Sequence, residues 1–221
     1  MKFESAEATV LDVRSIADQL YGLLRERILS GELEADSPIR QDVVASALNI
    51  SKIPLREALA RLEQDGLIRS FPKRGFFVAP LSAEEAEDVY RLRLKLEPDA
   101  ASAACMVADA REQAAARAAL AALEDALKVE DPAHGQYNRG FHLALVRPGA
   151  ARITVHIIET LNVIADRYVR IHLRPEGRDQ RANREHQAIL DAWLARDRRT
   201  VGTLLKAHIR DTQRDLQGQL K

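Results

Sequence analysis

The sequence contains a single cysteine and no excess of either charge. Cys105 has no second cysteine to pair with, which excludes an internal disulfide framework and favours a reducing compartment. The 33 lysine and arginine residues are balanced by 33 aspartate and glutamate residues, so the formal net charge is zero. No overall field therefore attracts nucleic acid, and any surface that binds it has to be a local basic patch.

Long apolar runs and targeting segments are also missing. No uninterrupted apolar stretch reaches membrane-spanning length, and the N-terminus has neither a signal-peptide nor a transit-peptide pattern. The 221 residues suffice for one large domain or two modest ones, each with its own core. We therefore expect a soluble cytoplasmic protein that has no membrane partner.

The first part of the chain predicts a small helical unit that ends in a β-hairpin. Residues 1–14 are polar and weakly patterned, so we expect a flexible N-terminal arm there. Ser15 is a good helix N-cap, Gly31 is a good stop, and two shorter helical patterns follow. The helices are expected at 15–30, 43–48 and 52–65, and two strands are expected at 67–71 and 76–79. The first domain is thus placed at 15–80.

The rest of the chain, 81–221, has continuous helical periodicity and no strand signals. Capping boxes start helices at Ser82 and Asp109, and Pro98 is expected to kink or split the first of these helices. Further helices are expected at 135–147, 150–172, 179–196 and 200–218. The sequence therefore predicts a mainly α protein, whose second domain is an all-α bundle of six or seven helices.

The helix at 52–65 and the hairpin after it form the local basic patch. Lys52 and Arg56 are four residues apart on one helix face, and Lys73 and Arg74 precede the turn glycine Gly75. The segment from residue 52 to residue 74 contains six basic residues and three acidic ones. A helix that begins with basic residues after a short turn suits the DNA major groove. Charge alone favours this interpretation and an ordinary solvated helix face about equally.

The order of these motifs resembles the winged helix-turn-helix of the GntR family of bacterial transcription regulators. The resembling stretches are L-R-E-R-I-L-S-G-E-L, S-K-I-P-L-R-E-A-L-A-R-L-E-Q-D-G-L-I and P-K-R-G-F-F-V. The resemblance implies a homodimer that binds double-stranded operator DNA. The implied DNA contacts are Lys52, Ile53, Arg56, Lys73, Arg74 and Gly75.

Three residues of the predicted helix-turn-helix differ from those usual in the family. Lys52 stands where arginine is usual, Ile53 where threonine is usual, and Asp42 where arginine is frequent. Lysine is a point charge without the bidentate fork of arginine, so we expect altered base specificity at Lys52.

Three of the six histidines lie on or beside apolar helical stripes. His142, His186 and His208 would therefore point toward a core, where each imidazole needs partners for both nitrogens. One shared metal ion would satisfy all three. The gaps of 44 and 22 residues are not a local metal signature, so spacing alone favours ordinary packed histidines.

The second domain resembles the FCD effector domain of the FadR and VanR branches of GntR regulators. The resembling stretches are V-Y-R-L-R-L-K-L-E-P-D-A-A, N-R-G-F-H-L-A-L, N-R-E-H-Q-A-I-L-D-A-W and the final H-I-R. The resemblance implies a divalent metal, zinc or a similar transition metal, bound by Asn138, His142, His186 and His208. It also implies an effector contact at Arg93, and we add Arg139 and Tyr168 as candidates.

Asn138 stands where the family has aspartate, which changes the expected charge of the site. A neutral amide leaves a divalent ion with three neutral imidazoles near +2, so metal affinity should fall unless another anion arrives. A small organic-acid effector held by Arg93 could supply that anion. In the alternative, metal is absent, and the histidines and Asn138 hydrogen-bond a polar ligand or water.

Three functions of different classes follow. The leading one is a ligand-responsive transcription regulator, a repressor or an activator. The second is a metal-dependent hydrolase with a three-histidine site, but no H-E-x-x-H motif is present, and Glu185 points about 100° away from His186 on a helix. The third is a dimeric DNA-binding protein whose helical bundle has a structural role and does not respond to a ligand.

Overall fold

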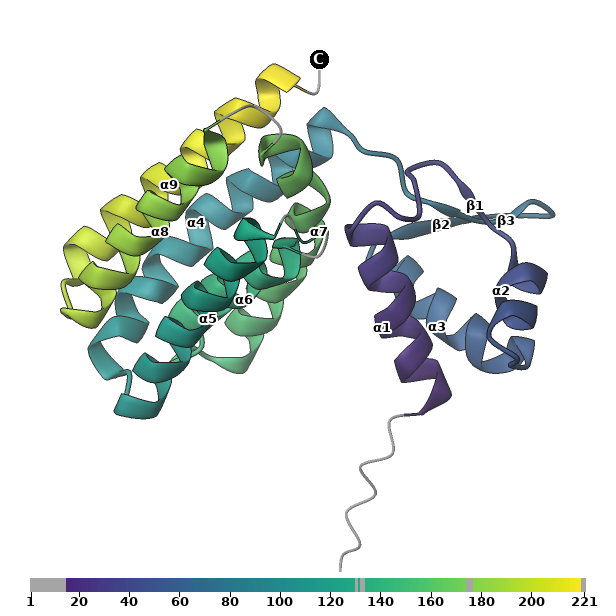
Figure 1. The fold of residues 1–221 in the computed structure, drawn as a ribbon, viewed down its shortest axis with the longest axis horizontal. Helices are drawn as coiled ribbons and strands as arrows, with labels where there is room; N and C mark the ends of the chain where they lie inside the picture. Colours follow the sequence, from purple (N-terminus) through teal and green to yellow (C-terminus); the bar gives the residue numbers. More distant parts are fainter. Residues whose placement is uncertain (1–14, 130, 132–133, 174–176, 220–221) are drawn as a thin grey trace, which may run out of the picture.

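The computed structural model describes residues 15–129, 131, 134–173 and 177–219. Within these residues the chain forms nine helices and three short strands, arranged as a small N-terminal unit and a larger helical bundle (Figure 1). The prediction of a mainly α fold is therefore confirmed. The arm expected at 1–14 lies outside the described residues.

The N-terminal unit packs three helices against a three-stranded antiparallel sheet. Its elements are α1 (Ile16–Leu29), β1 (Pro38–Ile39), α2 (Gln41–Ala47), α3 (Lys52–Gln64), β2 (Ile68–Phe71) and β3 (Gly75–Val78). The strand order is β1-β3-β2, with Ile39 opposite Phe76 and Ser70 opposite the same residue. The hairpin is as expected, whereas β1 was missed because two residues are too few to show a strand period.

The helices of this unit begin, end and pack for identifiable reasons. Ser15 and Asp18 form a reciprocal capping box at the start of α1. Gly31 and Gly66, both with positive φ, follow the ends of α1 and α3. The apolar stripe of α3 is fully buried, so the opposite side of this helix remains outside. That stripe consists of Leu55, Ala58, Leu59 and Leu62.

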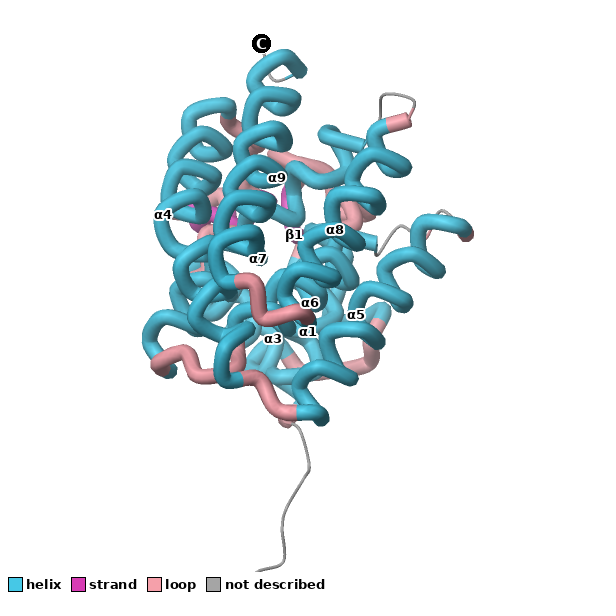
Figure 2. The backbone as a smooth tube through the Cα atoms, turned by 90° about the vertical axis from the view of Figure 1, so that its left-hand side faces the viewer, coloured by secondary structure: helices cyan, strands magenta, loops and turns pink. Residues whose placement is uncertain are grey.

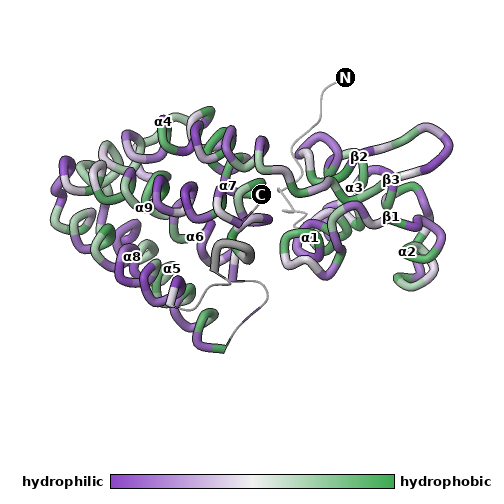
Figure 3. The backbone as a smooth tube through the Cα atoms, turned by 90° about the horizontal axis from the view of Figure 1, so that it is seen from above, coloured by the Kyte–Doolittle hydropathy of each residue, from purple (hydrophilic) through white to green (hydrophobic). Residues whose placement is uncertain are grey.

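Six helices make the bundle in the described part of the second domain. They are α4 (Ala83–Val107), α5 (Ala110–Lys128), α6 (His134–Val146), α7 (Arg152–Leu173), α8 (Arg178–Leu194) and α9 (Arg198–Gln219). Figure 2 shows these helices running roughly parallel to one another. Figure 3 shows hydrophobic and hydrophilic residues alternating along them, as expected for helices that bury one stripe each.

Pro98 does not split its helix, because α4 continues unbroken from Ala83 to Val107. Proline removes one backbone hydrogen bond, but α4 is held along its length by α9. The two helices approach closely at Gly202, where an added Cβ would lie 2.9 Å from the Ser102 hydroxyl oxygen. Packing against a neighbouring helix thus outweighs the local cost of the proline.

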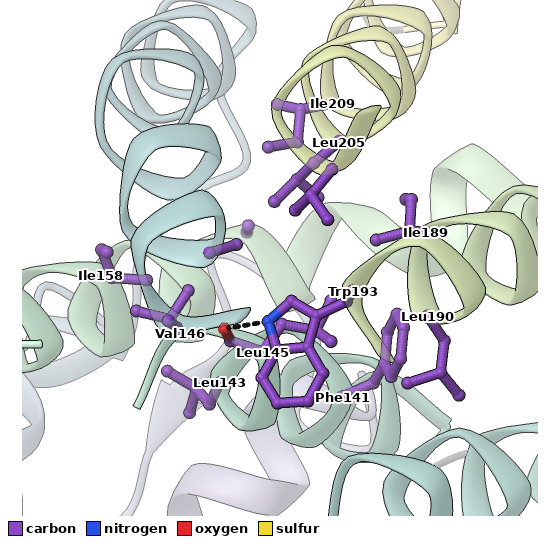
Figure 4. Packing of buried hydrophobic residues seen from close by; sticks show 14 of the residues in the cluster. Phe141, Leu143, Leu145, Val146, Ile158, Ile189, Leu190, Trp193, Leu205 and Ile209 are labelled. Atoms are coloured by element: carbon purple, nitrogen blue, oxygen red, sulfur yellow. Dashed lines mark hydrogen bonds between the residues drawn. The ribbon is translucent and has the colours of Figure 1, made fainter. Parts of the chain in front are cut away.

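The core of the bundle is centred on Trp193, whose side chain is 1% exposed. Its indole Nε1–H donates a hydrogen bond of 3.0 Å to the carbonyl oxygen of Leu145 on α6, among buried aliphatic side chains (Figure 4). The bond ties α8 to α6. No helix among the described residues is long and apolar enough to cross a membrane.

The two units meet at α7. Val163 of α7 belongs to the hydrophobic cluster of the N-terminal unit, and α7 contacts α1 directly. The buried guanidinium of Arg167 donates to the carbonyl oxygen of Ala79 in the connecting segment. The same guanidinium lies 3.6 Å from the Glu85 carboxylate at the start of α4. The connection between the units is therefore packed and hydrogen-bonded.

Replacement of Trp193 by phenylalanine tests the core. The variant keeps an aromatic ring but leaves the Leu145 carbonyl oxygen buried without its donor, so we expect a loss of about 1–3 kcal/mol in unfolding free energy. Urea unfolding followed by circular dichroism measures it. The exposed Val129→Ala change serves as control and should cost less than about 0.5 kcal/mol. Equal effects of the two changes would contradict this account.

Candidate functional site

The N-terminal end of α3 presents polar and apolar side chains to the outside. Lys52, Ile53 and Arg56 are all exposed there. The Lys52 ammonium forms an ion pair with Asp42 of α2, and Arg56 Nε donates to the Gln41 side-chain oxygen at 3.4 Å. Side chains of α2 therefore contact both cations. Asp42 stands where the family often has arginine. It therefore removes a basic residue from this surface and also forms an ion pair with Lys52.

The tip of the β2–β3 hairpin holds the other predicted DNA contacts. Lys73 and Gly75 both have positive φ, 64° and 86°, which makes the turn tight. The Arg74 guanidinium carbon lies 5.7 Å from the ring centre of Phe71 and 5.3 Å from that of Phe77. Cation–π contact with this edge-to-face pair restricts Arg74 and keeps it beside the tip.

A pocket inside the bundle brings most of the other predicted residues together. Helices α4, α5, α6, α7, α8 and α9 contribute to its lining. The lining residues are Tyr90, Arg93, Leu123, Leu127, His134, Asn138, His142, Val169, Ala182, His186, His208, Ile209 and Thr212. Only about 30 Å³ is open to the centre of a water molecule, which suits an ion with a few waters or a very small ligand.

The three predicted histidines converge in this pocket, although they come from three helices. Taking one nitrogen from each, His142, His186 and His208 place these atoms within 4.8 Å of one another. The Nε2 atoms of His186 and His208 are 3.1 Å apart. Long sequence gaps thus hide a compact cluster, because α6, α8 and α9 lie around one cavity.

Carboxylates hold the outer nitrogens of two of these rings. The Glu97 Oε2 atom lies 3.1 Å from His142 Nδ1, and the Glu185 Oε2 atom lies 2.6 Å from His208 Nδ1. The Nε2 atom of His142 is buried and has no hydrogen-bond partner among the described residues. Carboxylates at Nδ1 fix the tautomer and leave Nε2 available, which is the usual support of a metal-binding histidine.

Glu97 is itself part of a buried ion pair with Arg93. Arg93 Nε donates to Glu97 Oε1 at 2.5 Å, Arg93 Nη2 donates to Oε2 at 3.2 Å, and neither side chain is more than 3% exposed. Asn162 donates to Oε1 at 2.9 Å. Arg93 therefore lines the pocket as expected, but its charge is already matched by Glu97.

The pKa values of this chain favour a neutral imidazole and an ionised carboxylate. Burial opposes ionisation of Glu97, but Arg93 and His142 outweigh it and lower the pKa of Glu97 to about 2. Burial lowers the pKa of His142 below its usual range, against the opposing effect of Glu97. A neutral imidazole with a free Nε2 is the form that binds metal. The residues present therefore fit a divalent transition metal.

Asn138 lies one turn before His142 on α6 and lines the same pocket. Its side chain is half-buried, and it contributes a neutral amide where a carboxylate would add a negative charge. The predicted group of four is thus assembled around one cavity.

Arg139 and Tyr168 lie elsewhere and do not line the pocket. The Arg139 guanidinium pairs with Asp166 of α7 and lies 3.5 Å from Glu26 of α1. The Tyr168 hydroxyl donates to Glu85 at 2.6 Å and accepts from the Ser82 backbone N–H at 3.1 Å. Both side chains serve contacts at or near the boundary between the two units, so their positions do not support an effector contact.

Sequence reasoning overlooked three side chains of the site: Tyr90, Glu97 and His134. Two of them carried a usable signal. Arg93 and Glu97 are an i, i+4 pair of opposite charge, and His134 precedes Asn138 by the same spacing that separates Asn138 from His142. Tyr90 carried none, although its hydroxyl is buried without a hydrogen-bond partner in the described part of the chain.

Comparison with known proteins gives two family matches. Residues 16–78 match the family described as bacterial regulatory proteins, gntR family, and residues 88–211 match the FCD domain. Together they span both structural units.

Individual relatives agree with these matches. BphR of Paraburkholderia xenovorans (strain LB400), described as an HTH-type transcriptional regulator, is 30% identical over 93% of this chain and 87% of its own length. The HTH-type transcriptional repressor GlaR of Escherichia coli (strain K12) is 27% identical over 86% of this chain and 90% of its own. The solved structure of E. coli McbR/YncC is similar with a TM-score of 0.82 at 22% identity, over 95% of this chain and all of that one. The last likeness supports the fold alone.

Replacement of Glu97 by glutamine tests the buried ion pair. The variant leaves Arg93 buried without its counter-charge, so at pH 7 we expect unfolding free energy to fall by about 3–5 kcal/mol. The pKa of Glu97 is lowered in the folded state, so its stabilisation is present above about pH 4.5 and is lost as the pH falls toward about 2. The difference between wild type and variant should therefore shrink at acid pH.

Urea unfolding of chelator-treated protein at pH 7, 4 and 3 measures this difference. Glu87→Gln is the matched control, because Glu87 is an exposed glutamate on the same helix. A penalty at Glu97 that stays constant from pH 7 to pH 3 would contradict the assigned charge state.

Proposed function

The chain belongs to the GntR family of bacterial transcription regulators and carries an FCD domain, and we propose that it is a repressor whose dimer binds operator DNA under control of the bundle pocket. The observation that carries the pocket's role is the convergence of three buried imidazoles, two of which have a carboxylate at their outer nitrogen. The family consists of regulators, so the hydrolase alternative is set aside. Repression is suggested by relatives such as GlaR, which is named a repressor. A cytoplasmic location is part of the proposal.

The exposed end of α3 and the hairpin tip support DNA binding by this domain. An exposed cationic cluster at the start of a helix suits phosphates and base edges in the major groove, and a narrow basic hairpin tip suits the adjacent minor groove. A single unit reads one half-site only. Two copies related by two-fold symmetry would read both halves of a palindromic operator.

The pocket is proposed to hold a divalent transition metal through His142, His186 and His208, with Asn138 beside them. Such a metal would act as a Lewis acid that attracts the carboxylate of a small organic acid. The surrounding chain supplies three neutral imidazoles, and Glu97 and Glu185 provide negative charge one layer farther out. Arg93 is engaged by Glu97, so anion binding is assigned mainly to the metal.

Helix α6 offers a route by which the pocket could influence DNA binding. It presents Asn138 and His142 to the pocket, whereas Arg139 from the same helix reaches Asp166 of α7 and Glu26 of α1. A small rotation of α6 on ligand binding would therefore move the Arg139 guanidinium relative to α1. A shift of this kind changes where the two DNA-reading units of a dimer sit.

Replacement of Asn138 by aspartate tests the metal proposal. The added carboxylate lowers the net charge around a divalent ion, so we expect zinc affinity to rise about tenfold or more, equivalent to about 1.4 kcal/mol. Isothermal titration with zinc after chelation measures it. His142→Ala should abolish tight binding.

Asn49→Asp is the matched control, because Asn49 is exposed in the N-terminal unit and should leave zinc affinity unchanged. Zinc affinity that is unaffected by Asn138→Asp would show that residue 138 does not reach the ion.

Replacement of Arg139 by glutamine tests the proposed coupling. Zinc binding should persist, because Arg139 does not line the pocket, whereas the contact with Glu26 is lost. In the wild type we expect DNA affinity to differ at least about fivefold between zinc-loaded and chelated protein, a typical coupling strength. In the variant the difference should fall below about twofold.

Fluorescence anisotropy with an operator duplex measures both affinities. Arg147→Gln, near the end of the same helix and exposed, should respond like the wild type. A full zinc response in Arg139→Gln would remove Arg139 from the coupling route.

A further inference from the structure

Ile53 is an exposed apolar residue at the first turn of α3. Its side chain is 71% exposed, and the cations Lys52 and Arg56 lie one residue before it and three residues after it on the same helix. A lone exposed apolar side chain is common on protein surfaces and needs no explanation by itself. Its place is what matters, since the first residues of a recognition helix contact base edges in the major groove.

The two cations nearest to Ile53 on α3 both contact side chains of α2. Lys52 is paired with Asp42, and Arg56 is hydrogen-bonded to Gln41, so α2 contacts both cations. Isoleucine is β-branched, and in a helix its χ1 angle strongly prefers one rotamer. The direction of its branched Cβ is therefore restricted before DNA arrives.

Base edges in the major groove differ in what they offer such a side chain. Thymine carries a C5-methyl group there beside its O4 acceptor, and no other base has a methyl group in this groove. An aliphatic side chain gains by covering the methyl group, and it loses when it covers the amino group of cytosine or adenine without accepting its hydrogen bond.

We propose that Ile53 reads a thymine through its C5-methyl group and fixes one T·A pair in each operator half-site. This inference rests on the proposed DNA-binding function and adds a base preference to it. The preference for thymine at this position then comes from an apolar contact and not from a hydrogen bond. The lysine at position 52 contributes attraction to phosphate or a single acceptor, because it lacks the fork that reads guanine.

The test removes only the methyl group from DNA. Duplexes bound by the full-length protein are first selected from a random pool at physiological salt, because affinity without stated salt has no meaning. Each thymine of the selected site is then replaced by uracil, which lacks the C5-methyl group. At one thymine per half-site we expect wild-type affinity to fall about fourfold, the value of one buried methyl group.

Protein variants show whether Ile53 is the reader. Ile53→Ala should bind the thymine and uracil duplexes equally at that position, and the exposed side chain makes the change harmless to folding. Val43→Ala is the matched control, since Val43 is 59% exposed but lies on α2, and it should keep the wild-type sensitivity. Lys73→Ala should weaken binding to both duplexes alike.

Two results would overturn the inference. A selected site in which no thymine responds to loss of its methyl group contradicts it and leaves DNA recognition intact. Sensitivity to uracil that persists in Ile53→Ala assigns the contact to another residue. A pool in which no sequence is enriched contradicts both this inference and the proposed function on which it rests.

Discussion

The buried ion pair between Arg93 and Glu97 is the constraint on which the pocket depends. Two charges inside an apolar bundle are tolerated only when each is matched, and here Arg93, Asn162 and His142 all contact the Glu97 carboxylate. The pair orients His142 through its Nδ1 atom and leaves Nε2 facing the cavity. An apolar pair of the same size would pack as well, but it could not orient an imidazole.

The second organising feature is the position of α6 and α7 between the bundle pocket and the N-terminal unit. α6 carries pocket residues on one side and Arg139 on another, while α7 contributes Val163 to the core of the N-terminal unit. A single helix, α6, therefore separates the pocket from the N-terminal unit. The proposed coupling therefore needs no long chain of contacts, because α6 lines the pocket and also reaches α1 through Arg139.

Much of the fold follows from local patterns, whereas the site follows from packing. Ser15, Gly31 and Gly66 marked helix ends because capping chemistry acts within a few residues. The split expected as one outcome at Pro98 does not occur, since proline's local cost is outweighed by the contact of α4 with α9, which sequence does not reveal. Spacing did not show that His142, His186 and His208 would meet; family resemblance supplied that expectation. Glu97 could have been found from its i, i+4 relation to Arg93, but no pattern announces that Arg139 faces another domain.

The most direct test of the central constraint is the tautomer of His142, measured by long-range ¹H–¹⁵N NMR of protein labelled at histidine. Glu97 should hold the proton on Nδ1, so His142 should be a neutral ring with unprotonated Nε2 at pH 7, with zinc and after chelation. In Glu97→Gln this preference should be lost. A proton on Nε2 of His142 in the chelated wild type, or an imidazolium ring, would contradict the account.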